Sequence, residues 1–331
     1  MALVDQRLRD GHDPPMVLPG PGAVGEQHAG VRRALGNPPA PGHGAFARLD
    51  GDLPRQPVRH GVSQPPVRVP VMDGTQQHVT QQRVRIGSAD LLVCEDGAAL
   101  AVSAAAMIAS FIRREVTKAR AADGRLVSVA MAGGSTPVAT YRRLATMDIP
   151  WSGVCAWVGD ERYVPPDHED SNGAMIGRSL LDGAGARFLR VPWAADRAAD
   201  EAAALYEAEL LASMGGDSRG PHPDLILAGM GGDGHTLSLF PGSEALDVTD
   251  RWYVATKVAA GQPWRLTATY SLAHRAAAVY VLVSGASKAP ALAEVIRPTG
   301  DVPLPARRLM EGPAPVTWLV DRAAAAGLDL P

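Results

Sequence analysis

The sequence predicts an α/β fold in which a mostly parallel β-sheet is flanked by helices, and three observations lead to this prediction. First, from Val84 onward short apolar segments alternate with longer segments of helical periodicity, the pattern that βαβ units produce. Second, residues 224–230 form an almost uninterrupted apolar run, as is typical of a strand buried on both faces of a parallel sheet. Third, Pro and Gly dominate only before residue 80, so the fold is expected to begin near that point.

The first 80 residues are predicted to form a disordered N-terminal segment. Pro and Gly make up roughly a quarter to a third of it, the range at which aperiodic Pro and Gly indicate disorder. No helical or strand period persists there, and the start lacks the apolar core of a secretory signal. Two interpretations stay open, namely a flexible tail and a mis-assigned N-terminal extension for which Met72 is the true start. Residues 81–331 are then expected to form a single α/β domain.

The elements of this domain follow from hydrophobic periodicity and from the Gly and Pro residues at its boundaries. Short apolar runs predict strands, and Gly133 and Gly159 end two of them. Segments with apolar residues on one face predict helices, and Pro137 suits the first turn of one of them. Strands are expected at residues 84–86, 91–93, 126–131, 154–158, 188–191, 224–230, 266–272, 279–283 and 316–320, and helices at 96–121, 136–144, 171–181, 198–214, 286–296 and 322–327.

Charge, cysteine content and hydropathy exclude several classes of protein. The 331 residues carry a net charge of −3, whereas nucleic-acid-binding domains usually have a basic excess. Cys94 and Cys155 can form neither a disulfide framework nor a multi-cysteine metal site, so a reducing, cytoplasmic location is expected. The most apolar segment, residues 98–112, is shorter than the roughly 20 residues that span a membrane. It runs into charged residues, which predicts a core helix and no membrane association.

Candidate functional residues gather at four predicted strand ends, where open α/β sheets bind their ligands. The first group follows residues 126–131 and consists of Gly133, Gly134, Ser135 and Thr136 at the start of a helix. Glycines allow close backbone approach, and hydroxyls beside free helix N–H groups suit an anion such as phosphate. The alternative is a tight turn in which Ser or Thr caps the helix.

The second group follows the strand at residues 154–158. Asp160, Glu161 and Arg162 are three consecutive charges directly after a buried strand, so we expect Asp160 and Arg162 at a ligand site. The alternative is a solvated turn. Asn172, at the start of the next predicted helix, is a further candidate for ligand binding.

The third group is the most specific, because a glycine-dense loop holds Asp233 and His235 at the end of residues 224–230. Glycines let such a loop adopt positive φ and approach a ligand closely. A histidine there can act as a general base near neutral pH, and Asp233 can orient it or contact the substrate. A metal site is not expected, since no second His or Cys lies at ligand spacing.

The fourth group consists of two cations, Arg265 at the start of a strand and Lys288 after another strand. A Lys behind a Gly at a strand-to-helix junction suits the neutralisation of a phosphate. The alternative for each is an ordinary surface cation.

Taken together, these segments resemble the 6-phosphogluconolactonase family. The segments GGSTP, GDERYVPPDHEDSN, DLILAGMGGDGHTLSLFPG and SGASKA, with the strand that begins at Arg265, occur in the family's order across residues 83–328. The resemblance implies a fold like ribose-5-phosphate isomerase and glucosamine-phosphate deaminase. It also implies hydrolysis of 6-phospho-D-glucono-1,5-lactone in the pentose phosphate pathway, without a metal or other cofactor. The expected partner is this small sugar phosphate lactone, and the expected state is a monomer or small homo-oligomer.

Two other functions are alternatives to lactone hydrolysis, namely deamination or isomerisation of an amino-sugar phosphate and binding of a sugar phosphate without turnover. The related deaminases usually carry Asn-Glu-Pro after the His segment, where this chain has Leu239, Phe240 and Pro241. Sugar-phosphate effector domains of transcription regulators need an attached DNA-binding domain, which the Pro- and Gly-rich N-terminal segment is not expected to form. One departure from the family is Gly173, where an aromatic residue is common, and it bears on the role of Asn172.

These residues suggest a hydrolytic mechanism. Neutral His235 would take a proton from a water that attacks C1 of the lactone. Arg162 or backbone N–H groups of the glycine loops would stabilise the oxyanion. Arg265, Lys288 and the Ser135–Thr136 turn would hold the phosphate.

Overall fold

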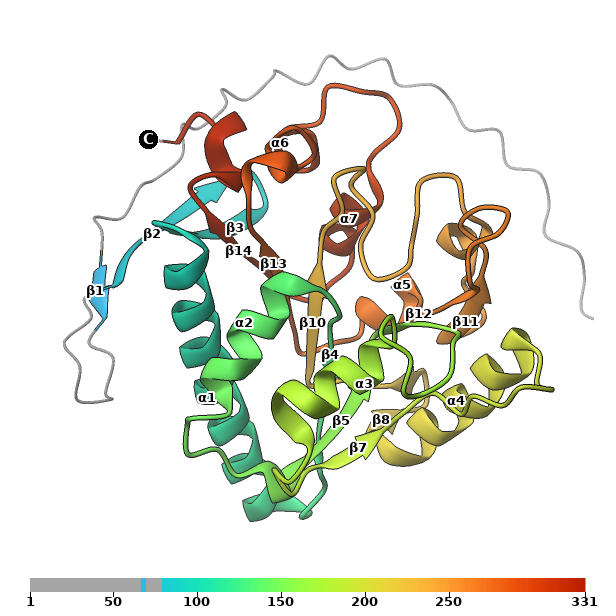
Figure 1. The fold of residues 1–331 in the computed structure, drawn as a ribbon. Coiled ribbons are helices and arrows are strands. Elements are labelled where there is room, and N and C mark those ends of the chain that lie inside the picture. Colours follow the sequence, from blue (N-terminus) through green and yellow to red (C-terminus); the bar gives the residue numbers. More distant parts are fainter. Residues whose placement is uncertain (1–66, 70–78, 331) are drawn as a thin grey trace, which may run out of the picture. The chain divides into compact units, whose positions relative to one another are not determined.

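A nine-stranded, mostly parallel β-sheet forms the centre of the part of the chain that the computed structural model describes, residues 67–69 and 79–330. Its strand order is β1-β2-β3-β14-β13-β10-β4-β5-β7 (Figure 1). All strands from β3 to β7 in this order run parallel, while β1 and β2 are antiparallel to their neighbours. The strands are β1 (Val67–Val69), β2 (Val79–Ile86), β3 (Ala89–Cys94), β4 (Val127–Met131), β5 (Val154–Val158), β7 (Arg187–Leu189), β10 (Leu225–Gly229), β13 (Ala278–Val283) and β14 (Val316–Asp321).

The remaining described strands form two small antiparallel sheets. One has the order β11-β12-β6 and consists of β11 (Tyr253–Thr256), β12 (Arg265–Ala268) and β6 (Asp160–Arg162). The other pairs β8 (Gly216–Asp217) with β9 (Gly220–Pro221). In the first of these sheets, β6 directly follows the central strand β5 and therefore lies at its carboxyl end.

The helices cover both faces of the central sheet. The α-helices are α1 (Gly97–Ala122), α2 (Ser135–Leu144), α3 (Asn172–Ile176), α4 (Ala199–Ser213), α5 (Tyr270–Ala273), α6 (Ala289–Ile296) and α7 (Pro305–Arg308). A π-helical turn follows α3 at Gly177–Leu181, and 3-10 turns lie at Trp151–Gly153, Glu244–Asp247, Ala286–Lys288, Leu309–Glu311 and Ala324–Gly327. The side chains of α1 and α2 pack on one face of the sheet, and those of α4, α5 and α6 pack on the other.

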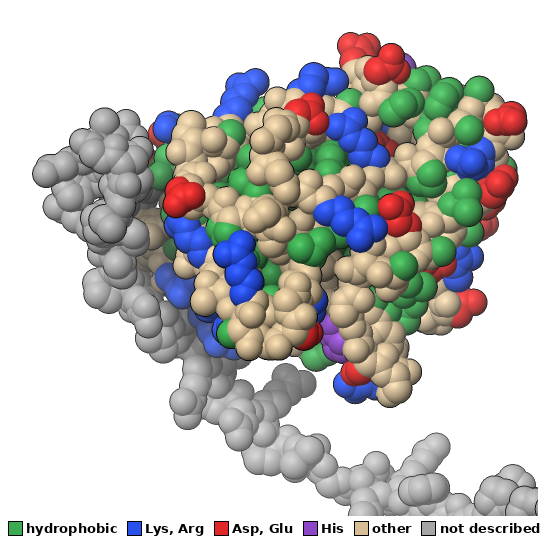
Figure 2. All heavy atoms as spheres, turned by 90° about the horizontal axis from the view of Figure 1, so that it is seen from below, with side chains coloured by type: hydrophobic (Ala, Val, Ile, Leu, Met, Phe, Trp, Pro, Cys, Tyr) green, Lys and Arg blue, Asp and Glu red, His purple; other side chains and the backbone are tan. Residues whose placement is uncertain are grey.

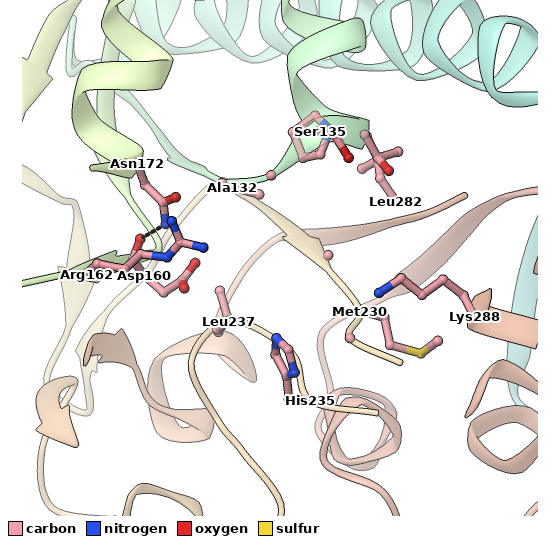
Figure 3. Close-up of a pocket in the computed structure, with 16 residues that line it drawn as sticks. Ala132, Ser135, Asp160, Arg162, Asn172, Met230, His235, Leu237, Leu282 and Lys288 are labelled. Atoms are coloured by element: carbon pink, nitrogen blue, oxygen red, sulfur yellow. Dashed lines mark hydrogen bonds between the residues drawn. The ribbon is translucent and has the colours of Figure 1, made fainter. Parts of the chain in front are cut away.

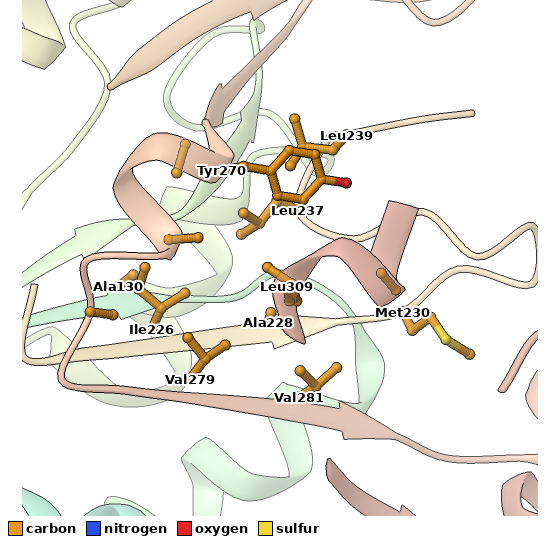
Figure 4. Packing of buried hydrophobic residues seen from close by; sticks show 14 of the residues in the cluster. Ala130, Ile226, Ala228, Met230, Leu237, Leu239, Tyr270, Val279, Val281 and Leu309 are labelled. Carbon is orange, nitrogen blue, oxygen red and sulfur yellow. The ribbon is translucent and has the colours of Figure 1, made fainter. Parts of the chain in front are cut away.

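The core follows from the two-residue period of the strands. In β10, Ile226 and Ala228 pack into one hydrophobic cluster, whereas Leu225 and Leu227 pack into the cluster on the opposite face. Figure 4 shows the first of these clusters, where Val279 of β13 lies near Ile226. Both faces of β10 are therefore buried, as its uninterrupted apolar run predicts.

Helix α1 belongs to this core. Asp96 caps its N-terminus by accepting a hydrogen bond from the backbone N–H of Ala99 at 2.8 Å. By length and composition α1 could cross a membrane. However, Ile108, Phe111 and Ile112 are buried against the sheet and α2, so we interpret it as a core helix.

Several predicted boundaries are wrong for local reasons. The strand expected at 266–272 ends at Ala268, because the Thr269 hydroxyl accepts from the N–H of Leu272 and begins α5. Asp160–Arg162, expected in a loop, form β6 by pairing with β12. The helix expected at 171–181 is an α-helical turn followed by a π-helical turn. The helix expected at 322–327 is only a 3-10 turn.

The predicted N-terminal segment is described only in part. β1 and the start of β2 lie within residues 1–80 and form strands, so the expectation of no regular structure is wrong for them. The remainder of that segment, including Met72, lies outside the described residues. Figure 2 shows acidic and basic side chains interspersed over one face of the molecule, as expected for a chain of net charge −3.

A buried acid joins two central strands at the edge of the sheet where they begin. Asp224, 5% exposed, accepts two hydrogen bonds from Arg125, both at 2.7 Å, and one from the N–H of Ser128 at 2.8 Å. We predict that Asp224→Ala lowers the free energy of unfolding by about 1.5–3 kcal/mol, because these donors lose a charged acceptor. Urea denaturation followed by tryptophan fluorescence measures this change.

The matched control is Asp329→Ala. Asp329 also pairs with an arginine, Arg297, at 3.0 Å, but its side chain is fully exposed. Exposed ion pairs contribute little to stability, so this variant should unfold like the wild type. Equal unfolding midpoints for the Asp224 and Asp329 variants would contradict the prediction.

Candidate active site

A cavity lies at the carboxyl ends of four strands that are neighbours in the central sheet, β13, β10, β4 and β5. Because the strands are parallel, the four loops that follow them meet at one edge. These loops are the four segments that the sequence singles out. Eight of the ten predicted site residues line the cavity: Gly134, Ser135, Thr136, Asp160, Arg162, Asn172, His235 and Lys288. Figure 3 shows Asp160, Arg162 and Asn172 on one side and Lys288 on the other, with His235 between them.

Asp233 and Arg265 do not line the cavity but contact or flank residues that do. Asp233 Oδ1 lies 2.6 Å from Nδ1 of His235 and also accepts from the backbone N–H of His235 at 3.1 Å. Arg265 of β12 is paired in register with Arg162 of β6. The sequence left two roles open for Asp233, orientation of His235 and contact with the substrate. Its position beside His235 and outside the cavity lining favours orientation.

The close approach of backbone and side chain explains the glycines of the His235 loop. A Cβ atom on Gly231 would lie 2.1 Å from Nδ1 of His235, so no larger residue fits there without displacing the ring. The His235 side chain is 30% exposed, and its ring packs against Phe240 with centroids 4.2 Å apart. The imidazole is therefore fixed on one side and open to the cavity on the other.

The ionisation state of Asp233 decides which ring nitrogen of His235 is available to accept a proton. Partial burial raises the pKa of the Asp233 carboxyl, but the hydrogen bonds and charge of His235 outweigh burial, and the pKa is lowered. An ionised carboxylate only accepts hydrogen bonds, so the neutral imidazole must donate from Nδ1. Its Nε2 atom then carries the lone pair that a general base requires.

The turn after β4 presents the N-terminus of α2 to the cavity. Gly134 has φ 102° and is the N-cap residue, and no side chain of the described residues caps this helix. The alternative of a Ser or Thr cap is therefore wrong. Uncapped N–H groups and the hydroxyls of Ser135 and Thr136 are suited to an anion.

The opposite wall is built from β6 and the start of α3. Asp160 accepts a hydrogen bond from Ser238 Oγ at 2.7 Å. Desolvation raises the pKa of the Asp160 carboxyl and exceeds the opposing effects of Ser238 and Arg162. The Asn172 side chain donates from Nδ2 to the Asp160 carbonyl at 2.7 Å, so Gly173 does not leave Asn172 unrestrained.

Three cations lie at or beside the cavity. None of Arg162, Arg265 and Lys288 forms an ion pair with a described residue. Burial, followed by repulsion from Arg162, lowers the pKa of Arg265. Cations that form no ion pair, beside a helix N-terminus, suit an anionic ligand. Within residues 67–69 and 79–330, no group of three or more His, Cys, Asp or Glu residues is placed to hold a metal ion.

Two buried acids next to the cavity, Asp321 and Glu161, are not among the site residues that the sequence predicts. Asp321, 3% exposed, ends β14 and accepts hydrogen bonds from Ser284 Oγ and the N–H of Gly285, which hold the turn before Lys288. Glu161 lies between Asp160 and Arg162 but faces away from the cavity. The position of Asp321 at the end of an apolar strand could have marked it as a residue near the site. The orientation of Glu161 could not be predicted, because the sequence does not show that residues 160–162 form a strand.

The strand order and the position of the glycine loops define an α/β protein of the glucosamine-6-phosphate deaminase fold. A solved monomeric glucosamine-6-phosphate deaminase matches with a TM-score of 0.57 at 21% identity, covering 72% of this chain and 99% of that one. The chain belongs to the family of glucosamine-6-phosphate isomerases/6-phosphogluconolactonase, whose model matches residues 96–318. The resemblance drawn from the motifs is confirmed.

Several relatives and solved structures that this chain resembles are named 6-phosphogluconolactonase. A 6-phosphogluconolactonase of Synechocystis sp. is 39% identical over 221 residues, 66% of this chain and 90% of the relative. One of Nostoc sp. is 38% identical over 207 residues, 61% of this chain and 85% of the relative. The solved 6-phosphogluconolactonase from Trypanosoma brucei has a TM-score of 0.66 at 26% identity, covering 74% of this chain and all of that one.

We predict that the Nδ1–H tautomer of His235 depends on Asp233. In Asp233→Asn the amide can present either a donor or an acceptor to Nδ1, so the preference for one tautomer should weaken. Nitrogen-15 chemical shifts of the neutral imidazole ring distinguish the two tautomers. An unchanged Nδ1–H signal in the variant would show that Asp233 does not set the tautomer.

Proposed function

We propose that this chain hydrolyses 6-phospho-D-glucono-1,5-lactone to 6-phospho-D-gluconate, as a 6-phosphogluconolactonase of the oxidative pentose phosphate pathway. The observation that carries the proposal is His235, which is paired with Asp233 and lines a cavity together with Arg162 and Lys288, two cations that form no ion pair with a described residue. The relatives with this name support it. A cytoplasmic location, the absence of nucleic-acid and membrane partners, and a monomeric or small homo-oligomeric state remain predictions.

The chemical step uses His235 as a general base and then as a general acid. Nε2 takes a proton from a water molecule while the water oxygen bonds to C1 of the lactone. The resulting tetrahedral intermediate collapses when the bond from C1 to the ring oxygen breaks. His235 returns its proton to that oxygen, which becomes the C5 hydroxyl. Asp233 stabilises the imidazolium that exists between these two transfers.

Binding and charge stabilisation fall to the other groups at the cavity. Arg162 or backbone N–H groups of the glycine loops stabilise the oxyanion that develops on the C1 carbonyl oxygen. Lys288 and the Ser135–Thr136 turn bind the phosphate, and Arg265 contributes positive charge from beside Arg162. Fixing the remote phosphate holds C1 near His235, so that binding energy is used for orientation.

The alternative functions are separated by simple assays. In the segment after His235, Phe240 packs on the imidazole where the deaminases usually have an additional carboxylate close by. Acid release from the phospholactone supports the lactonase, whereas ammonia release from glucosamine-6-phosphate supports a deaminase. Binding of these sugars without turnover of either supports an effector-binding domain. The coupled lactone assay, corrected for spontaneous hydrolysis, is the decisive test.

We predict that His235→Ala lowers kcat by about 10²–10⁴-fold with little change in KM, since general base catalysis contributes by this order. The matched control is His222→Ala, because His222 also pairs with an aspartate, Asp217, at 3.1 Å but does not line the cavity. Near-wild-type turnover of His235→Ala would refute the assignment of His235 as the general base.

We predict that Lys288→Ala chiefly raises KM. Loss of a charged hydrogen bond costs about 1.5–3 kcal/mol, or roughly 10- to 100-fold in binding. Lys118→Ala is the matched control, because Lys118 pairs with Glu115 on α1 at 3.1 Å and lies outside the cavity. Initial rates over a range of lactone concentrations separate KM from kcat. A decrease in kcat without a rise in KM would contradict the assignment of Lys288 to the phosphate site.

A further inference from the structure

Strand β6 directs its three side chains to two sides. Asp160 and Arg162 line the cavity, and since side chains alternate along a strand, Glu161 between them points the other way. Glu161 is 5% exposed, and none of the described residues forms an ion pair with it. A buried carboxylate without a cationic partner must be stabilised by other donors.

Four hydrogen bonds satisfy this carboxylate. Oε1 accepts from the backbone N–H groups of Arg162 and Asn172, at 2.8 and 2.7 Å. Oε2 accepts from the N–H of Gly173 at 2.7 Å and from Ser171 Oγ at 3.1 Å. Burial raises the pKa of Glu161, and the backbone donors oppose this effect only in part. The donors come from β6 itself and from the first turn of α3, so one side chain joins these two elements.

Both joined elements carry a residue of the cavity wall. The Asn172 side chain lies so close to the turn after β4 that a Cβ atom on Gly133 would be 2.0 Å from its Oδ1. Arg162 donates from Nη1 to the carbonyl of Asp170 at 2.8 Å, just before α3. A small shift of α3 relative to β6 would therefore displace both Arg162 and Asn172 from their places.

We propose that Glu161 is a positioning residue, whose buried carboxylate sets Arg162 and Asn172 at the wall of the cavity for lactone hydrolysis. The inference rests on the proposed function for its kinetic consequences, but the placement itself is a property of the fold. Glutamine cannot replace Glu161, because its amide offers one acceptor oxygen and brings an NH₂ donor toward groups that are themselves donors.

The experiment compares Glu161→Gln with a matched buried acid. Glu207 of α4 is 9% exposed and accepts from the N–H groups of Trp252 and Tyr253, yet it does not line the cavity. In the lactone assay, Glu161→Gln should lose up to about 10²-fold in kcat, the effect of a misplacement near 1 Å. Glu207→Gln should keep the kcat of the wild type, although both variants lose stability.

A double-mutant cycle separates positioning from general structural support. If Glu161 acts through Arg162, adding Glu161→Gln to Arg162→Ala should cost little beyond Arg162→Ala alone. Fully additive losses, or a wild-type kcat in Glu161→Gln, would overturn the proposal. If Glu161→Gln does not fold, Ser171→Ala removes one of the four hydrogen bonds and takes its place in the cycle. A wild-type kcat in Ser171→Ala would then overturn the proposal.

Crystal structures of the wild type and Glu161→Gln test the placement without any substrate. We expect Asn172 to leave Gly133 and the Arg162 guanidinium to move. If both stay in place, the inference fails even where the wild type hydrolyses the lactone. If the wild type does not hydrolyse the lactone, the proposed function fails, and these structures alone decide whether Glu161 positions the wall.

Discussion

Burial of the central strands on both faces is the constraint on which the rest of the molecule depends. β10 has apolar side chains on both sides of the sheet, and its neighbours β4 and β13 pack into the same two clusters. A strand of this kind has no place for a charged side chain along its length, because an unpaired buried charge is too costly. Polar chemistry is therefore confined to the strand ends. Because the strands are parallel, the ends of β13, β10, β4 and β5 collect it at a single edge.

Close backbone approach turns that edge into a shaped site. Gly231 leaves room for the His235 ring, and Gly133 leaves room for the Asn172 side chain, each within a distance that no Cβ atom tolerates. The two glycines belong to loops after different strands, β10 and β4, and each admits a side chain toward the cavity. His235 is thus held by contacts to Asp233 and Phe240 and not by a hydrophobic pocket. Such fixation leaves one face of the imidazole open to a ligand.

The sequence was sufficient for the parallel strands of the central sheet and for eight residues that line the cavity. It was insufficient where pairing between distant segments decides the outcome. Continuous apolar runs identify β4, β5, β10, β13 and β14, because burial on both faces leaves a pattern that is local. β6 has no apolar run, because it consists of three charged residues. These residues form a strand only because they pair with β12, about 100 residues later in the chain. The same pairing explains why Arg265 lies beside Arg162. Thr269 illustrates the opposite case, where a single local hydrogen bond ends a predicted strand.

The buried acids Glu161 and Asp321 show how a cationic cavity is kept available for an anion. Glu161 precedes Arg162 in the chain, and Asp321 is hydrogen-bonded to the turn before Lys288. Each acid accepts hydrogen bonds from backbone N–H groups and from a serine hydroxyl. Had either acid formed an ion pair with Arg162 or Lys288, an anionic ligand would have to break that pair on binding. Backbone donors satisfy the carboxylates without consuming the cations. The acids therefore hold the two walls in place while the positive charge of Arg162 and Lys288 stays directed at the cavity.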